Sequence, residues 1–177
     1  MEYKRKIIVY IAMSIDGYIA KDDGDISWLS IVEREGEDYH YSEFIKTIDT
    51  VIMGRKTYDK VLSMVDKFPH ENKKCYIITR TKRPDIKNIE FYCGELKSLI
   101  NKLKEREGEN IFVDSGAEII NQLMEFDLID EYIISIIPII LGEGIRLFKL
   151  DNKGIKLKLL SAETFDSGLV QLHYCKN

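Results

Sequence analysis

Short runs of hydrophobic residues, each of strand length, recur along the chain. They are rich in β-branched and aromatic side chains, which favour extended backbone, and they cover residues 7–13, 51–53, 76–78, 111–113 and 132–140. Between these runs, hydrophobic residues recur at helical spacing over residues 58–65, 96–103 and 119–124. The pattern therefore predicts strands and helices in alternation.

This alternation predicts an α/β fold. Parallel strands need crossover connections and are buried on both faces, so the pattern favours a mostly parallel central sheet with helices on both faces. Residues 155–165 and 169–175 alternate differently, between hydrophobic and polar positions, around a turn at Asp166-Ser167-Gly168. They predict a C-terminal antiparallel hairpin that closes one edge of the sheet. We find no repeat and no linker, and interpret residues 1–177 as a single domain.

Composition narrows the class of protein. Hydrophobic residues make up 45% and charged residues 32% of the chain, as in ordinary globular proteins. A net charge of -4 argues against nucleic acid or an acidic membrane as partner, because phosphate groups select clustered Lys and Arg. The 3 cysteines and 3 histidines are scattered, which disfavours a disulfide framework and predicts that the protein binds no metal. We expect a reducing, cytoplasmic location.

A strand that ends in glycine and opens directly into a helix is the sharpest local signal, at residues 49–58. A helix start exposes unpaired N–H groups and a partial positive charge, and Gly54 lets a ligand approach the backbone. Arg55 and Lys56 add full charges, so the segment predicts a phosphate site. The alternative is a structural turn with two solvated cations.

Two further segments suit the same ligand. Residues 111–119 repeat the strand-to-helix pattern through Ser115 and Gly116, and both helix starts are expected to converge on one diphosphate, because ligands of open α/β sheets bind at the carboxyl ends of strands. Thr79-Arg80-Thr81-Lys82-Arg83 follows another strand and offers cations for a 2′-phosphate. Simple helix capping and an exposed basic loop are the respective alternatives.

Taken in order, these segments resemble the dihydrofolate reductase superfamily, and most closely its branch similar to the reductase domain of the riboflavin-biosynthesis deaminase-reductase. The resemblance covers nearly the whole chain and rests on residues 12–20, 51–58, 115–118, 128–132 and 138–148. Ser115 departs from the family, whose members usually carry paired glycines there. The resemblance implies NADPH as cofactor, held by Ala12, Ile19, Gly54, Arg55, Lys56, Thr57, Thr79, Arg80, Thr81, Ser115, Gly116, Ala117 and Glu118.

The resemblance also implies residues for the chemistry. Folate reductases use a carboxylate on the helix before the phosphate turn, and a count back without gaps reaches Asp38, whose alternative role is a helix N-cap. Asp16, in an Asp-Gly turn after the first strand, is a second catalytic candidate and equally a turn residue. Trp28, within the irregular stretch 22–38, is expected either to cover the substrate or to anchor this loop to the core. Tyr58 and Ser135 are expected on the substrate side.

Two functions remain open at this point. The first is a reductase that transfers a hydride from NADPH to a pterin-like or ribosylaminopyrimidine-like heterocycle. The second is a non-catalytic dinucleotide-binding module that acts as a sensor or scaffold. The family resemblance further implies a homodimer, with residues 132–140 and the C-terminal hairpin as candidate interface.

Overall fold

The strands of the protein form one large sheet and one small one. The computed structural model describes residues 4–149 and 154–177. In chain order the elements are β1 (Ile7–Ser14), β2 (Tyr18–Ala20), the 3-10 helix η1 (Ser27–Val32), α1 (Tyr41–Lys46), β3 (Ile48–Gly54), α2 (Arg55–Met64), β4 (Lys74–Ile78), β5 (Ile89–Tyr92), α3 (Leu96–Lys104), β6 (Asn110–Val113), α4 (Ala117–Glu125), β7 (Glu131–Ile137), β8 (Ile145–Arg146), β9 (Leu157–Thr164) and β10 (Val170–Lys176).

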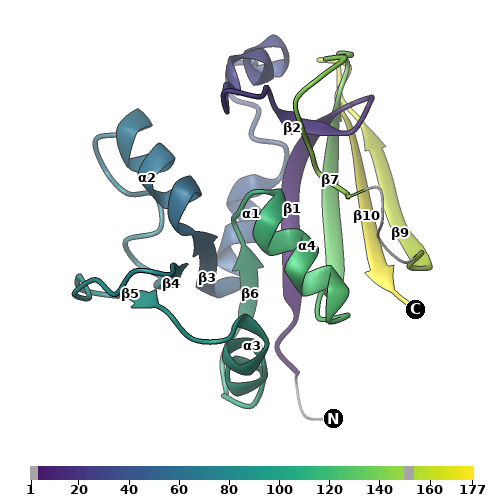
Figure 1. Cartoon of the computed structure of the whole chain (residues 1–177). Helices are drawn as coiled ribbons and strands as arrows, with labels where there is room; N and C mark the ends of the chain where they lie inside the picture. Colours follow the sequence, from purple (N-terminus) through teal and green to yellow (C-terminus); the bar gives the residue numbers. More distant parts are fainter. Residues whose placement is uncertain (1–3, 150–153) are drawn as a thin grey trace.

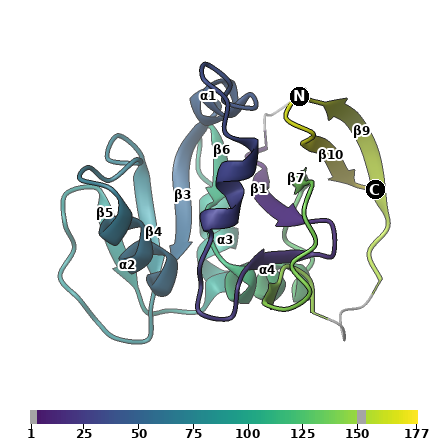
Figure 2. The ribbon, with the colours of Figure 1, turned by 90° about the horizontal axis from the view of Figure 1, so that it is seen from above.

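The large sheet has eight strands in the order β5-β4-β3-β6-β1-β7-β10-β9. All neighbours pair in parallel, except that β10 is antiparallel to both β7 and β9. Seen from above, β4 and β5 lie at one end of the sheet and the β9–β10 hairpin lies at the other (Figure 2). The predicted fold class, a mostly parallel sheet closed by a C-terminal antiparallel hairpin, is confirmed.

Helices cover both faces of this sheet (Figure 1). The first hydrophobic layer packs α3 and α4, through residues such as Ile100 and Ile120, against alternate positions of β1, β3, β6 and β7. The second layer packs Phe44 of α1 and Tyr58 of α2 against the opposite side of the same strands. Both layers are buried, which explains why the inner strands read as continuous hydrophobic runs.

Three local features differ from the sequence-based expectation. The strand expected at residues 132–140 ends at Ile137, because Pro138 follows and Ile140 is 72% exposed. Residues 22–38 contain the helix η1, which buries Trp28 and Val32. Strand β8 is exposed and pairs only with β2, so its sequence carries no burial pattern.

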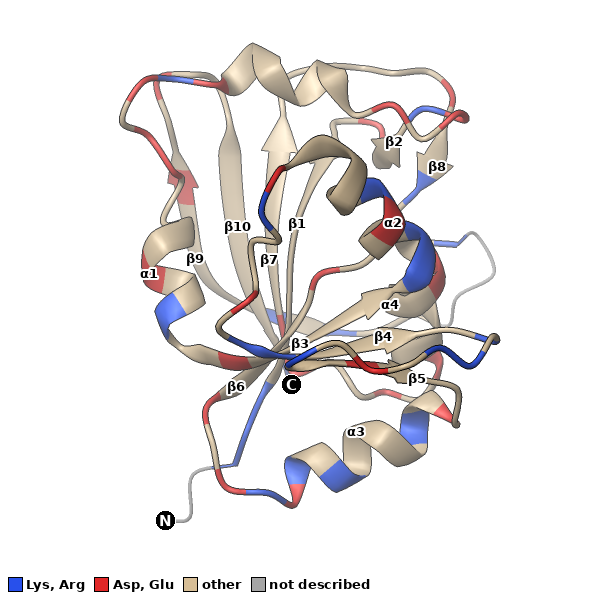
Figure 3. Ribbon diagram, turned by 90° about the vertical axis from the view of Figure 1, so that its left-hand side faces the viewer, with Lys and Arg blue, Asp and Glu red and all other residues tan. Residues whose placement is uncertain are grey.

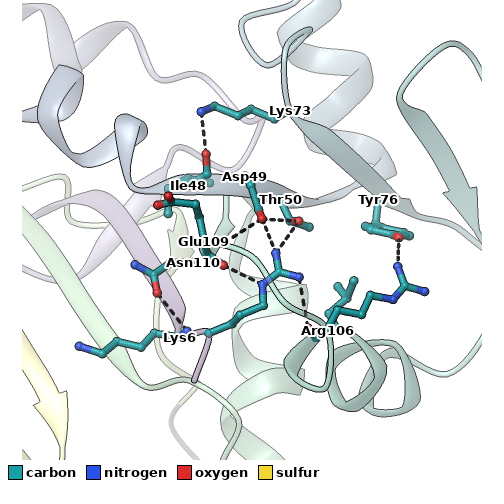
Figure 4. A network of polar contacts seen from close by, with 11 residues as sticks. Lys6, Ile48, Asp49, Thr50, Lys73, Tyr76, Arg106, Glu109 and Asn110 are labelled. Carbon is teal, nitrogen blue, oxygen red and sulfur yellow. Dashed lines mark hydrogen bonds and ion pairs between the residues drawn. The ribbon is translucent and has the colours of Figure 1, made fainter. Parts of the chain in front are cut away.

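The basic residues before β1 include a buried arginine that joins several elements. Arg5 is 4% exposed and its guanidinium donates to the carbonyls of Leu103 and Glu109 at 3.2 and 2.7 Å and to Oγ1 of Thr50 at 2.8 Å. It also pairs with Asp49, whose carboxylate accepts from the Glu109 amide at 2.9 Å. Figure 4 shows this network. The buried charge is tolerated because its donors find acceptors, and it ties β1 to β3 and α3.

Among the described residues, no helix is long and apolar enough to cross a lipid bilayer.

Candidate functional site

The starts of helices α2 and α4 lie next to each other at the carboxyl ends of β3 and β6. These strands are neighbours in the sheet, so the turns that follow them meet. The amide of Gly54 donates to Oγ of Ser115 at 3.0 Å, and the amide of Gly116 donates to Oγ1 of Thr57 at 3.3 Å. The expected convergence of the two helix starts is therefore found. The described residues contain no cis peptide bond, so the Ser115–Gly116 bond is trans.

Neither helix start carries a side-chain cap. The first amides of a helix have no partner within the helix and carry a partial positive charge. Two such groups of amides side by side, at Arg55 to Thr57 and at Ala117 to Ile119, form a place where the backbone can bind an anion with two phosphate groups.

Gly54 keeps this place open. A Cβ atom at position 54 would lie 3.1 Å from Oγ of Ser115 and 3.3 Å from Cγ1 of Ile119, tighter than ordinary van der Waals contact. Glycine therefore allows the two turns to approach and also leaves the backbone accessible. From the sequence we expected a ligand to approach the Gly54 backbone closely. In the structure the turn at Ser115 makes this close approach.

Charged side chains surround the helix starts. Arg55 is half-exposed and pairs with Asp59 one turn later in α2, and Asp59 also lies 3.5 Å from Nη1 of Arg83. Lys56 is exposed. Figure 3 shows Lys and Arg on both sides of one acidic residue along α2. Arg55 and Lys56 therefore lie at the surface beside the turn, and Arg55 forms an ion pair with Asp59.

The third predicted segment lies at the same edge. Nη2 of Arg80 is 3.5 Å from Oε1 of Glu118 in the first turn of α4, and the Arg80 side chain is 95% exposed. Thr79 is buried, and its Oγ1 accepts from the Thr81 amide at 3.1 Å, which shapes the turn after β4. All three segments that were proposed to hold one dinucleotide therefore meet at one end of the sheet.

A polar network lies on the α1 face of the sheet, next to the end of β1. Ala12 pairs with Ser135 of β7, and Nε2 of Gln171 donates to Oγ of Ser135 at 3.2 Å and to the Tyr10 hydroxyl at 2.9 Å. The Tyr10 hydroxyl donates to the carbonyl of Tyr39 at 2.6 Å. Burial raises the pKa of Tyr10, so its hydroxyl stays protonated as a donor. Gln171 was not predicted, because only strand pairing brings it to this place.

Ile19 lies elsewhere, on β2, where it packs against the hydrophobic layer under α3 and α4. The other two residues expected on the substrate side are core residues. Trp28 is buried with Ile137 and Leu169, and its Nε1 has no hydrogen-bond partner. The ring of Tyr58 packs edge-on against Phe91 at 5.7 Å. Tyr58 therefore supports α2 rather than lining an open site.

The structure does not place Asp38 on the helix before the phosphate turn. This residue is exposed and precedes α1, because Tyr39 and His40 adopt positive φ angles of 55° and 66° and the helix begins only at Tyr41. Its carboxylate accepts from the amides of Ser42 and His40 at 2.9 and 3.0 Å. Hydrogen bonds from Ser42 and His40 lower the pKa of Asp38. The alternative interpretation, a helix N-cap, is also wrong, because His40 occupies the N-cap position of α1 and Asp38 lies two residues before it.

Asp16 also accepts hydrogen bonds from backbone amides. Its carboxylate accepts from Oγ of Ser14 at 2.6 Å and from the amides of Leu141 and Gly142 at 3.1 and 2.7 Å. These hydrogen bonds, with that of Ser14 the strongest, lower the pKa of Asp16 to about 2. Asp16 thus joins the β1–β2 turn to the segment after β7, and we do not retain it as a catalytic acid.

A different acid lies beside the helix starts. Asp114 directly follows β6, and its Oδ2 is 2.7 Å from Nε2 of the buried residue His70. Nothing in the spacing linked it to His70, 44 residues away.

A hollow of about 870 Å³ lies at the opposite end of the strands, away from the helix starts. Two of its lysines form ion pairs: Lys6 pairs with Glu131 at 2.6 Å and Lys104 pairs with Asp130 at 2.6 Å. The chemistry-bearing turns do not reach it. The carboxyl edge of the sheet is therefore the candidate site.

The family model of the RibD C-terminal domain matches residues 5–171. The chain belongs to this family.

The comparisons with individual proteins agree. The chain is 43% identical, over 98% of its length and 99% of the relative's, to the uncharacterized protein YwjB of Bacillus subtilis. Among solved structures it is similar to a “Putative riboflavin biosynthesis protein” from Shewanella, with 30% identity, a TM-score of 0.86 and coverage of 97% and 99% of the two chains. A dihydrofolate reductase from Enterococcus faecalis, complexed with NADP(H), shares the fold with a TM-score of 0.66, 13% identity and coverage of 100% and 99%.

Proposed function

We propose that the protein is an NADPH-dependent reductase that acts on a conjugated C=N or C=O bond of a heterocycle of pterin or ribosylaminopyrimidine type. The observation that carries the proposal is the contact between Gly54 and Ser115, which brings two uncapped helix starts together. Membership of the RibD C-terminal domain family supports the same conclusion.

The residues present fit this cofactor. In our proposal the amides of residues 54–57 and 115–118 bind the diphosphate, and Arg55, Lys56 and Arg80 supply cations for the remaining phosphate. Ala12 is proposed to border the nicotinamide, whereas Ile19, which packs into the hydrophobic layer under α3 and α4, is left out of the proposed site. When bound, NADPH supplies the hydride, and the protein positions the substrate and manages its proton.

The substrate is proposed to lie over the α1 face of the sheet beside the end of β1. The hydroxyls and amide of Tyr10, Ser135 and Gln171 are linked by hydrogen bonds and provide polar groups of fixed orientation there. Fixed donors and acceptors of this kind suit a flat ring with polar edges. This placement keeps the ring next to the proposed cofactor turn.

Cofactor binding tests the proposal directly. Calorimetric titration is expected to show much tighter binding of NADPH than of NADH. Arg55→Ala is expected to weaken NADPH binding by about 1.5 to 3 kcal/mol, as for the loss of a charged hydrogen bond. The matched control is Lys102→Ala, which removes one exposed cation from α3. Equal affinity for NADPH and NADH would contradict the proposal.

Turnover separates this proposal from the non-catalytic binding module. Loss of NADPH absorbance is to be followed with dihydrofolate, a deaminated ribosylaminopyrimidine and a panel of small carbonyl compounds. Reduction of any of them supports the reductase. Tight NADPH binding without turnover of any of them would favour a sensor or scaffold instead.

A further inference from the structure

One carboxylate on α2 contacts two arginines beside the proposed cofactor turn. Asp59 forms an ion pair with Arg55 through Oδ2, and its Oδ1 lies 3.5 Å from Nη1 of Arg83. Arg55 is the first residue of α2, whereas Arg83 follows β4 at the end of the basic run 79–83. Asp59 therefore joins cations from two of the segments that we propose to hold the dinucleotide.

Arg83 is also held from a second side. Its guanidinium lies over the ring of Phe91 on β5, 5.6 Å from the ring centroid, which is within the range of a cation–π contact. The same Phe91 ring packs edge-on against Tyr58 of α2 at 5.7 Å. The turn after β4 and the first turns of α2 are thus held next to each other, and the two guanidinium groups share one carboxylate.

The contacts of Asp59 are contacts that a phosphate group could make. Carboxylates and phosphates both accept the paired N–H donors of a guanidinium. The side chains of Asp59, Arg55 and Arg83 are 40%, 38% and 39% exposed, so water competes for both ion pairs and each is weak. A phosphate monoester carries a charge of about −1.5 to −2 near neutral pH and has three acceptor oxygens. Such a phosphate can therefore replace Asp59 at the two arginines.

A second carboxylate at this edge of the sheet makes a looser contact. Glu118 of α4 lies 3.5 Å from Nη2 of Arg80, and both of these side chains are exposed. Asp59 is the only acidic residue of α2. Removal of Asp59 is therefore the change that alters the charge at Arg55 and Arg83 most directly.

We propose that Asp59 limits the affinity for the 2′-phosphate of NADPH because it occupies Arg55 and Arg83 in the free protein. This inference rests on the proposed cofactor. On binding, the phosphate takes the place of the carboxylate, which costs two ion pairs and leaves two negative groups side by side. The 2′-hydroxyl of NADH is neutral and leaves Asp59 on its arginines. Asp59 is thus a specificity-determining residue that lowers the preference for NADPH over NADH.

Asp59→Asn keeps the shape of the side chain and removes its charge. By calorimetric titration we expect the Kd for NADPH to fall at least about threefold, as for removal of one unit charge roughly 6 Å from another in water. The Kd for NADH should stay nearly constant. A smaller gain for NADPH, a loss, or the same gain for NADH would overturn the inference.

Two further variants separate the position of the charge from its sign. Asp66→Asn removes the same charge from an exposed position beyond the end of α2, and it is the matched control that should leave the Kd for NADPH unchanged. Asp59→Glu keeps the carboxylate on α2 and should bind NADPH as the unchanged protein does. A gain in Asp66→Asn equal to that in Asp59→Asn would overturn the inference, because any lost acid would then have the same effect.

A double-mutant cycle tests whether Asp59 acts through Arg55. In an Arg55→Ala background, Asp59→Asn should improve the Kd for NADPH by a smaller factor than in the unchanged protein, because one of the two occupied arginines is absent. Equal factors in the two backgrounds would show that Asp59 acts only as a distant charge. That result would overturn the occupation of Arg55.

A cofactor fragment distinguishes failure of this inference from failure of the proposed function. 2′,5′-ADP carries the 2′-phosphate without nicotinamide, and 5′-AMP lacks that phosphate. Asp59→Asn should tighten binding of 2′,5′-ADP at least about threefold and leave 5′-AMP unchanged. Binding of 2′,5′-ADP without this gain would overturn the inference and leave the reductase in place. The gain without turnover of any substrate would support the inference and overturn the reductase, and binding of neither NADPH nor 2′,5′-ADP would overturn both.

Discussion

At the scale of single residues, small side chains decide the site. Gly54, Thr57, Ser115 and Gly116 allow two turns to meet, with each hydroxyl accepting from the amide of the opposite turn. The sequence identified all four, because a buried strand that runs through small residues into a helix is a local pattern. It did not identify the cross-contacts, since these depend on β3 and β6 being neighbours.

Gly54→Ala tests this arrangement. The added methyl would lie 3.1 Å from Oγ of Ser115, so the two helix starts must separate by a few tenths of an ångström. We expect a roughly 10-fold or greater loss of NADPH affinity by calorimetry, with destabilisation of about 1 to 3 kcal/mol in urea, as for modest overpacking. Gly154→Ala is the control, because a Cβ there meets no atom within 4 Å. Unchanged NADPH affinity in Gly54→Ala would contradict a phosphate site at this turn.

At the scale of elements, long inner segments were predictable and short outer ones were not. β1, β3 and β6 have hydrophobic layers on both faces, and burial on two sides leaves a continuous pattern in the sequence. Both residues of β8 are exposed, so this strand leaves no hydrophobic pattern in the sequence. The error at Asp38 has the same origin: two residues with positive φ shorten α1, and a count along the chain does not detect them.

The turn after β1 shows how one carboxylate can join two elements. The pKa of Asp16 is lowered to about 2, below the usual value of 3.8. Its hydrogen bonds to Leu141 and Gly142 therefore contribute their full stability at pH values above 3.8. That contribution is lost as the pH falls through about 2. The join should therefore persist through mildly acidic conditions.

Hydrogen exchange measures this join. In the unchanged protein, protection of the Leu141 and Gly142 amides, corrected for intrinsic rates, should stay constant from pH 7 down to about 4. Asp16→Asn should reduce that protection by roughly 10-fold or more, because a neutral amide is a weaker acceptor than a carboxylate. Asp166→Asn, in an exposed turn, should leave it unchanged. Equal protection in both variants would show that Asp16 does not hold the segment.

At the scale of the whole molecule, the structure revises the expected dimer interface. Residues 131–137 form β7, which is buried between β1 and β10, so most of the proposed run 132–140 cannot contact a second chain. The β9–β10 hairpin at the edge of the sheet can contact a second chain. β9 pairs only with β10 in the sheet, and Leu159 and Leu160 are 50% and 47% exposed. We therefore confine the predicted homodimer contact to β9 and β10.

Leu159→Lys tests this contact. A charge in an apolar interface must be desolvated, so we expect the dimer Kd to rise at least about 10-fold, measured by sedimentation equilibrium. Ile86→Lys is the control, because Ile86 is equally exposed, at 50%, but lies outside the hairpin. A monomeric unchanged protein, or equal dissociation of both variants, would contradict the hairpin dimer.

The sequence by itself determined what depends on neighbouring residues: the parallel α/β fold, the two glycine-bearing helix starts, the basic turn after β4 and the resemblance to the reductases. Periodicity, turn chemistry and unpaired helix amides act over a few residues, so they can be read along the chain. Tertiary structure decided which side chains meet. His70 reaches Asp114, Gln171 reaches Tyr10 and Asp16 reaches Gly142 only because strand order and loop paths bring distant segments together.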